Sequence, residues 1–167
     1  MPSIAPCAHT RREGLTTDSW ITPKFLIDRL GPFDMDPCAA TPQPWRTATR
    51  MIGEDEDGLL RIWSGFVWLN PPYGKSLGVW LNRLALHGSG IALVFARTDT
   101  KAFQQNVFPF ASLLLFISGR LTFCTPEGKS APLGHNSGGP SVLIAYGDVA
   151  RDRLIKNRDL GAIVRVV

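Results

Sequence analysis

Four short, largely apolar segments constrain the fold of this chain more than any other feature of its sequence. They lie at 66–69, 91–96, 112–117 and 140–147. Continuous apolar runs of this length are typical of strands that are buried on both faces of a sheet. Segments with apolar residues at helical spacing, at 76–86 and 100–111, separate the first three runs. The alternation predicts an α/β protein whose mostly parallel sheet is covered by helices on both faces.

Shorter and less regular segments surround this predicted core. Thr22 and Pro23 are typical of a helix start, because proline suits the first turn. Turn-forming residues are frequent at 38–65, where no clear strand is evident. We expect a helix at 22–30, a short strand at 32–36, an irregular segment at 38–65, a short exposed strand at 120–124 and a loop at 125–139.

The length of 167 residues fits a single domain. Residues 1–19 contain no apolar signal-peptide stretch and are interpreted as a flexible arm, so the folded domain is predicted to cover 20–167. No segment approaches about 18 uninterrupted apolar residues, which argues against a membrane span. We therefore expect a cytoplasmic protein.

Charge and cysteine content narrow the functional classes. The chain carries 18 Lys and Arg against 14 Asp and Glu, a net charge of +4, with basic clusters at 11–12 and 151–158. This surplus suits a polyanionic partner such as nucleic acid, and a solvated basic surface remains the alternative. Cys7, Cys38 and Cys124 are far apart and show no metal-ligand spacing, so no metal site is expected.

Two predicted strands end in similar polar residues. Asp36 ends the strand at 32–36 and precedes a proline, and Asn70 follows the strand at 66–69 and precedes two prolines. Ligands of open parallel sheets bind beyond the carboxyl ends of the strands, at a point where the strand order reverses. The sequence therefore predicts a binding site at this edge of the sheet.

The segments "DPCAA" (36–40) and "NPPY" (70–73), in this order, resemble motifs of amino-group methyltransferases that use S-adenosylmethionine. Together with further segments, these two motifs resemble the phage-type, Dam-like family of DNA N6-adenine methyltransferases over most of residues 20–147. The further segments are "WITPKFLIDRLG" (20–31), "DGLLRIWSG" (57–65), "ARTDTKAF" (96–103) and "GRLTF" (119–123).

This resemblance implies both a fold and a biological setting. The implied fold is a Rossmann-like S-adenosylmethionine methyltransferase fold, a single compact domain with a mostly parallel sheet and a final antiparallel strand. The implied activity is DNA methylation by a phage- or prophage-encoded enzyme in the cytoplasm of a bacterial host, as in restriction-modification. Neither a metal nor a membrane is implied, and the expected partner is DNA.

The chemistry of amine methylation accounts for the residue types of NPPY. The lone pair of the exocyclic adenine amine is delocalised into the ring and must be localised as the new bond forms. The side-chain oxygen of Asn70 and the carbonyl of Pro71 are suited to accept from the two N–H groups. Pro71 and Pro72 stiffen the turn, and Tyr73 offers a flat face to an extruded base. A rigid turn without chemistry is the alternative.

The resemblance places the cofactor around the first predicted strand. Related enzymes carry a glycine-rich turn there, whereas this chain has DPCAA, whose small side chains still allow a ligand near the backbone. Asp57 is the candidate for binding the cofactor ribose. A cap role for Asp36 and a solvated acidic loop around Asp57 remain alternatives. The expected cofactor-binding residues are Thr22, Pro23, Asp36, Pro37, Cys38, Ala39, Asp57 and Asn70, and the expected product is S-adenosylhomocysteine.

Basic residues in or near these motifs are the candidates for contacts to DNA. The forked donors of arginine suit phosphate, and surface ion pairs are the alternative role. No separate target-recognition region is evident, and a homodimer would enlarge the available surface. The expected DNA-contacting residues are Lys75, Arg97, Lys101, Arg120 and Lys129.

Two other enzyme classes are excluded by the residues themselves. A P-loop needs a glycine five positions before its second glycine, and the Gly-Lys pairs at 74–75 and 128–129 have Leu69 and Phe123 there. Cytosine-C5 methyltransferases carry their nucleophilic cysteine at the strand end that holds NPPY here, so Cys38 does not fit that role. Enzymes of the same fold that methylate RNA or a protein glutamine remain alternatives, as does a non-catalytic nucleic-acid-binding relative.

Overall fold

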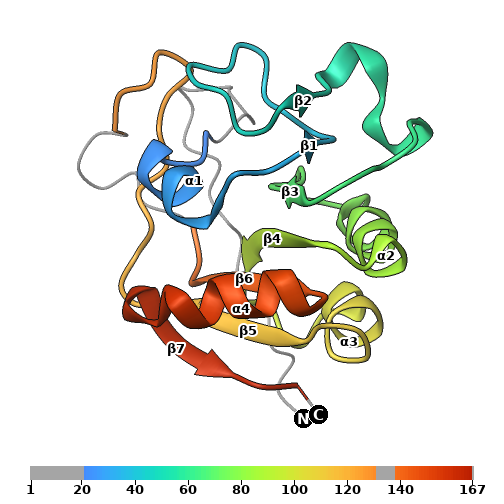
Figure 1. Cartoon of the computed structure of the whole chain (residues 1–167), viewed down its shortest axis with the longest axis vertical. Coiled ribbons are helices and arrows are strands. Elements are labelled where there is room, and N and C mark those ends of the chain that lie inside the picture. Colours follow the sequence, from blue (N-terminus) through green and yellow to red (C-terminus); the bar gives the residue numbers. More distant parts are fainter. Residues whose placement is uncertain (1–20, 131–137, 167) are drawn as a thin grey trace, which may run out of the picture.

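Seven strands form one sheet in the order β2-β1-β3-β4-β6-β5-β7 (Figure 1). The computed structural model describes residues 21–130 and 138–166, so the predicted arm at 1–19 and part of the predicted loop at 125–139 lie outside it. The strands are β1 Met35–Asp36, β2 Arg50–Met51, β3 Val67–Leu69, β4 Gly90–Phe95, β5 Leu113–Ile117, β6 Ser141–Tyr146 and β7 Gly161–Val164. The helices are α1 Lys24–Leu30, α2 Leu77–His87, α3 Lys101–Asn106 and α4 Asp148–Lys156, with 3-10 turns η1 Glu54–Glu56, η2 Gly58–Leu60 and η3 Arg158–Leu160.

The strand directions match a Rossmann-like methyltransferase fold. Strands β1 to β5 run in one direction, and β6 and β7 run in the opposite one, because β6 pairs antiparallel with both β4 and β5. The antiparallel strand expected at 140–147 is confirmed as β6, but it is not the final one, because β7 follows it and also runs antiparallel to β5. The chain passes from β1 to β2 on one side and returns to β3 on the other, so the strand order reverses between β1 and β3. This is the point at which open α/β sheets bind ligands.

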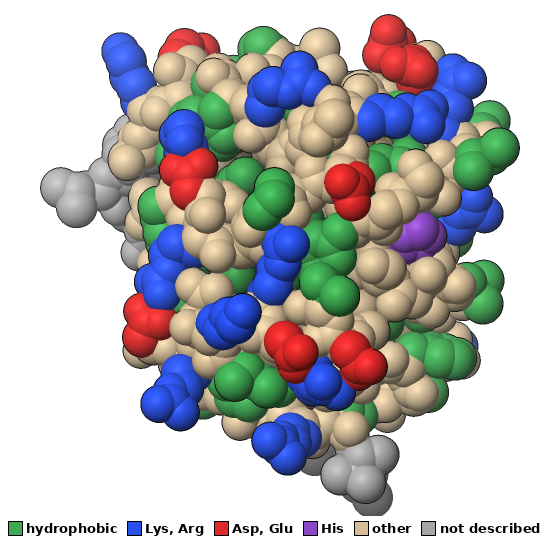
Figure 2. Space-filling view, viewed as in Figure 1, with side chains coloured by type: hydrophobic (Ala, Val, Ile, Leu, Met, Phe, Trp, Pro, Cys, Tyr) green, Lys and Arg blue, Asp and Glu red, His purple; other side chains and the backbone are tan. Residues whose placement is uncertain are grey.

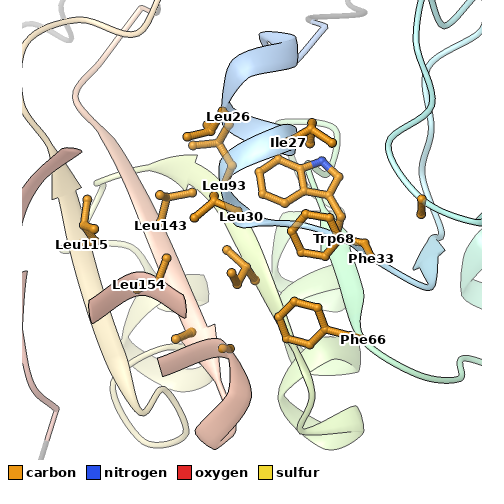
Figure 3. Packing of buried hydrophobic residues seen from close by; sticks show 14 of the residues in the cluster. Leu26, Ile27, Leu30, Phe33, Phe66, Trp68, Leu93, Leu115, Leu143 and Leu154 are labelled. Atoms are coloured by element: carbon orange, nitrogen blue, oxygen red, sulfur yellow. The ribbon is translucent and has the colours of Figure 1, made fainter. Parts of the chain in front are cut away.

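Helices cover both faces of the sheet. Leu26 and Leu30 of α1 and Leu154 of α4 pack on one face, where Figure 3 shows them near Trp68 and Leu93. Leu81 of α2 and Phe103 of α3 pack on the other face. The residues of β4 alternate between the two layers: Ile91 and Leu93 face the first, and Ala92 and Val94 face the second. Burial on both faces is what the uninterrupted apolar runs predict.

The molecular surface carries both signs of charge. On the face drawn in Figure 2, Lys and Arg side chains are spread among acidic ones rather than gathered into a single patch. Several of the basic side chains are paired locally, such as Arg29 with Asp159 and Arg151 with Asp148. Within residues 21–130 and 138–166, no helix combines the length and apolarity needed to cross a bilayer.

The structure corrects the prediction for residues 120–124. They do not form an exposed strand: only Cys124 bridges to Ile21 and Ser130, and Leu121, Phe123 and Cys124 are buried. Leu121 and Phe123 belong to the core layer that contains α1, and Cys124 pairs with Ile21, which precedes α1 and is distant in sequence. The predicted helix at 22–30 is observed as α1 and begins at Lys24, after Pro23.

Two further elements differ from the predictions made from the sequence. The basic cluster at 151–158 forms most of α4, in which Ala150 and Leu154 are buried against the sheet. Inside the segment expected to be irregular, Arg50 and Met51 form β2 and pair with β1 at the edge of the sheet.

Candidate active site

A cavity of about 410 Å³ lies beyond the carboxyl ends of β1 and β3. We call it the strand-end cavity. It stands where the strand order reverses, as expected for a ligand site in a sheet of this kind. Its volume is within the usual range for small-molecule and cofactor sites. The described residues that line it are Thr22, Asp36, Pro37, Cys38, Ala39, Ala40, Gln43, Thr47, Gly53, Asp57, Gly58, Trp68, Asn70, Pro71, Pro72, Tyr73 and Trp80.

Asp36 is the buried acid of this cavity. It is only 3% exposed, at the end of β1, and its carboxylate accepts hydrogen bonds from the hydroxyl of Thr47 and from the backbone N–H of Cys38 at 3.1 Å. Burial raises the pKa of Asp36 from 3.8 to about 6, and the two hydrogen bonds limit that rise. The carboxylate is therefore charged at neutral pH but incompletely compensated, which favours a positively charged ligand nearby.

Asn70 lies on the neighbouring strand end, and its contacts include Thr22 and Cys38. Its side-chain nitrogen donates to Thr22 Oγ1 at 3.2 Å, which sets the direction of the amide. Its backbone carbonyl accepts from the thiol of Cys38 at 3.3 Å. Burial raises the pKa of the Cys38 thiol well above its ordinary value, with a further rise from the charge of Asp36, so the thiol stays protonated and can donate. Cys38 thus links the ends of β1 and β3.

The turn after β3 presents an aromatic ring to the cavity. Pro71 is buried and Pro72 is exposed, and Tyr73 lies at the wall. The ring of Tyr73 stacks on Phe95, with centroids 4.3 Å apart and planes inclined by 9°. One face of Tyr73 is therefore covered by Phe95, the last residue of β4. Burial raises the pKa of Tyr73 above its ordinary value, so the phenol is neutral at physiological pH.

Asp57 and Gly58 also line the cavity. Asp57 adopts a left-handed backbone conformation (φ 47°), and its side chain accepts from the Leu59 N–H at 3.1 Å. Gly58 packs directly on the backbone of Pro37, where an added Cβ would lie 1.7 Å from the carbonyl oxygen. Only glycine fits this contact. Asp57 therefore caps η2 and also lies on the cavity wall, whereas the alternative considered for it was a solvated acidic loop.

Most of the residues that the sequence singled out as site candidates line this one cavity. It gathers Thr22 and Asp57, the run Asp36 to Ala39 and the run Asn70 to Tyr73. Pro23 is buried next to it but is not part of the lining. Their chemical roles stay predictions.

The basic candidates are divided between two locations. Lys75, Arg97 and Lys101 line a second hollow of about 560 Å³ between α2 and α3, which we call the α2–α3 groove. Arg120 and Lys129 are exposed and line neither the strand-end cavity nor the α2–α3 groove.

Sequence reasoning missed several residues of the strand-end cavity. Gln43 and Thr47 come from the irregular segment, which has no periodic hydrophobic pattern. Trp80 lies on the apolar face of a helix, a position that predicts a core residue. The Thr47 hydroxyl donates a hydrogen bond to the Asp36 carboxylate, although the two residues are eleven positions apart and the segment between them has no regular structure. The only sequence signal for such a role was the expectation that a buried carboxylate needs a donor.

The charge of the strand-end cavity suits a cationic ligand. Its described lining contains Asp36 and Asp57 and neither Lys nor Arg. S-adenosylmethionine carries positive charge on its sulfonium and amino groups, so the donor set fits that cofactor. In the described part of the chain, no group of three or more His, Cys, Asp and Glu side chains is arranged to hold a metal ion.

Comparison with known proteins gives one match. A family model described as DNA N-6-adenine-methyltransferase (Dam) matches residues 9–159, which confirms the resemblance indicated by the DPCAA and NPPY segments. No curated protein and no solved structure matches the chain.

Proposed function

This chain belongs to the DNA N-6-adenine-methyltransferase (Dam) family, and we propose that it transfers a methyl group from S-adenosylmethionine to N6 of adenine in DNA. The observation that carries the proposal is the joint position of Asp36 and Asn70. They stand at adjacent strand ends, line one cavity and are linked through Cys38. In the proposed reaction, Asp36 would face the cofactor and Asn70 would face the amine within this one site.

The cofactor is assigned to the half of the cavity formed by β1. Asp36 would attract its positively charged end, while Ala39 and Ala40 leave room beside the backbone. Asp57, which also lines the cavity, would bind the ribose hydroxyls. When bound, S-adenosylmethionine supplies an electrophilic methyl group on sulfur.

The amine is assigned to the half of the cavity formed by the turn after β3. Asn70 Oδ1 and the Pro71 carbonyl would accept from the two N–H groups of the amine, which localises its lone pair for attack. The contact with Thr22 fixes the amide of Asn70 before substrate arrives, so the acceptor is preorganised. Tyr73, supported from behind by Phe95, offers its remaining face to a base extruded from the duplex.

The alternatives differ in substrate or in catalysis. An RNA or protein-glutamine methyltransferase would use the same cavity, and a non-catalytic relative would keep the fold. The family membership favours DNA adenine. The acidic lining of the cavity and the orientation of Asn70 favour a working enzyme over a binding protein.

The test is methyl transfer from labelled S-adenosylmethionine to mixed-sequence duplex DNA, with RNA and protein in parallel, followed by nucleoside analysis. We expect label in N6-methyladenine of DNA. Asn70→Ala should lower turnover by about 10²- to 10³-fold, the usual effect of removing one preorganised polar group. Asn70→Asp keeps an acceptor and is the matched control, since the Thr22 hydroxyl can donate to it.

Two outcomes would overturn the proposal. Wild-type turnover in Asn70→Ala, with fold and cofactor binding verified by circular dichroism and calorimetry, would refute the mechanism. Absence of cofactor binding by the wild-type protein at millimolar concentration would instead favour the non-catalytic reading.

A further inference from the structure

We propose that the α2–α3 groove binds the phosphate backbone of the DNA strand from which the adenine is extruded. This inference rests on the proposed function and extends it to the surface beside the cavity. The groove is formed by the first residues after NPPY, by α2 and α3, and by the end of β4. Tyr73 lines both the strand-end cavity and the α2–α3 groove, so a base in the cavity would have its own backbone at the groove.

The charge of the groove is the opposite of that of the cavity. Lys75, Arg97 and Lys101 line it, and none of its described lining residues is acidic. The cavity, on the other side of Tyr73, has two acids and no base among its described lining residues. Tyr73 therefore lies between the strand-end cavity, which suits a cation, and the α2–α3 groove, which suits an anion. That division matches a reaction with a cationic methyl donor and a polyanionic acceptor.

Among the described residues, the three groove cations lack the ion pairs that some other basic residues make. Arg29 and Arg61 each pair with a carboxylate. Within the part of the chain that the structure describes, Lys75, Arg97 and Lys101 have no carboxylate oxygen within ion-pair distance. Uncompensated cations gathered in a hollow raise the local positive potential and attract phosphate.

The other groups of the groove suit a nucleotide strand. Asn82 and Gln105 add amide donors, and the guanidinium of Arg97 lies 5.9 Å from the ring centroid of Phe95. Gly74 stands between Tyr73 and Lys75 with φ of +126°, a conformation that favours glycine, and open space lies where its side chain would be. A nucleotide backbone could therefore approach the chain closely at Gly74.

The test is the salt dependence of DNA binding. Labelled duplex is titrated with wild-type protein and with the triple variant Lys75→Gln, Arg97→Gln, Lys101→Gln in 50 to 200 mM salt. Each neutralised phosphate contributes about 0.7 to 0.9 to the slope of log affinity against log salt, so three contacts give a slope difference of about 2 to 3. Over this fourfold salt range the wild type should lose roughly 20- to 40-fold more affinity than the variant.

A control variant removes the same charge elsewhere. The control changes three exposed bases on α4, η3 and the segment after β7: Lys156→Gln, Arg158→Gln and Arg165→Gln. Its slope of log affinity against log salt should differ from the wild-type slope by no more than about 1. Cofactor binding by calorimetry should be the same in all three proteins. In methylation assays, the groove variant should raise KM for DNA more than it lowers kcat.

The outcomes separate this inference from the proposed function. If the wild type methylates DNA and the groove variant keeps its affinity and slope, the groove assignment is wrong and the function stands. The groove assignment would also be wrong if the salt dependence of binding became weaker in the control variant and not in the groove variant. If the wild type methylates no DNA but the groove variant loses salt-dependent binding, the proposed function fails and the groove stands as a DNA-binding surface.

Discussion

Asp36→Asn should make the ligand-free protein more stable at neutral pH, although it alters a residue of the proposed active site. The substitution keeps the shape of the side chain. Its oxygen can still accept from the Cys38 N–H, and its nitrogen can donate to the Thr47 hydroxyl, which is able to accept. What it removes is the buried negative charge.

The magnitude follows from the pKa of Asp36. A carboxyl group whose pKa is about 6 in the folded protein and 3.8 when unfolded costs about 3 kcal/mol of stability above pH 6. Because the folded-state pKa is raised, the contribution of Asp36 to stability is most favourable below about pH 4 and is lost as the pH rises through 6. We expect Asp36→Asn to gain about 2 to 3 kcal/mol at pH 7.5, or roughly 4 to 12 °C in Tm for a chain of this size. The gain should vanish below about pH 4.

The assay is urea denaturation of the wild type and variant at a series of pH values from 4 to 8. The difference between the two proteins isolates Asp36 from the other titrating groups. Asp28→Asn, an exposed acid-to-amide change on α1, is the matched control and should stay within about 0.5 kcal/mol of wild type. A variant no more stable than wild type at pH 7.5, or a difference that does not change between pH 4 and 6, would refute the reasoning. The variant should also bind S-adenosylmethionine more weakly.

Two further substitutions test contacts that stabilise the fold. Gly58→Ala should lower the free energy of unfolding by at least about 2 kcal/mol, because its Cβ would lie 1.7 Å from the Pro37 carbonyl oxygen. Arg153→Ala should cost about 2 kcal/mol, because its guanidinium donates to the carbonyls of Leu30 and Pro32 at 2.7 and 2.8 Å and joins α4 to the end of α1. Urea denaturation at pH 7.5 measures both changes.

Each of these substitutions has a control with little expected effect. Gly138→Ala adds a Cβ in open space, and Lys156→Ala truncates an exposed base on α4. Equal stability losses in Gly58→Ala and Gly138→Ala would mean that the contact with Pro37 is unimportant. The same comparison between Arg153→Ala and Lys156→Ala tests the link from α4 to α1.

The central strands and the location of the site could be predicted from the sequence. Strands β3 to β6 are buried on both faces, so their apolar runs are uninterrupted and easy to identify. The polar ends of β1 and β3 indicated a common edge, because parallel strands bring their carboxyl ends together. That is why most site candidates line one cavity.

The edges of the fold could not be predicted in the same way. β2 has only two residues, with Arg50 exposed, so it carries no alternating or apolar pattern. In α4, charged residues outnumber the two buried apolar ones, and the segment was interpreted as a basic cluster. The hydrogen bond of Thr47 to Asp36 depends on the path of an irregular segment, which local patterns do not determine.

The short strands β1 and β2 have a consequence for the dynamics of the site. Each has two residues, and the pair is joined by few backbone contacts, among them Arg50 N–H to the Asp34 carbonyl and Ile52 N–H to the Asp36 carbonyl. Amide protons of this edge should therefore exchange with solvent through local opening, at a lower free energy than those of β4 and β6. A ligand that contacts both Asp36 and Asp57 would stabilise this edge and slow its exchange. Under the proposed function, cofactor binding would thus suppress the local opening of the sheet edge that receives it.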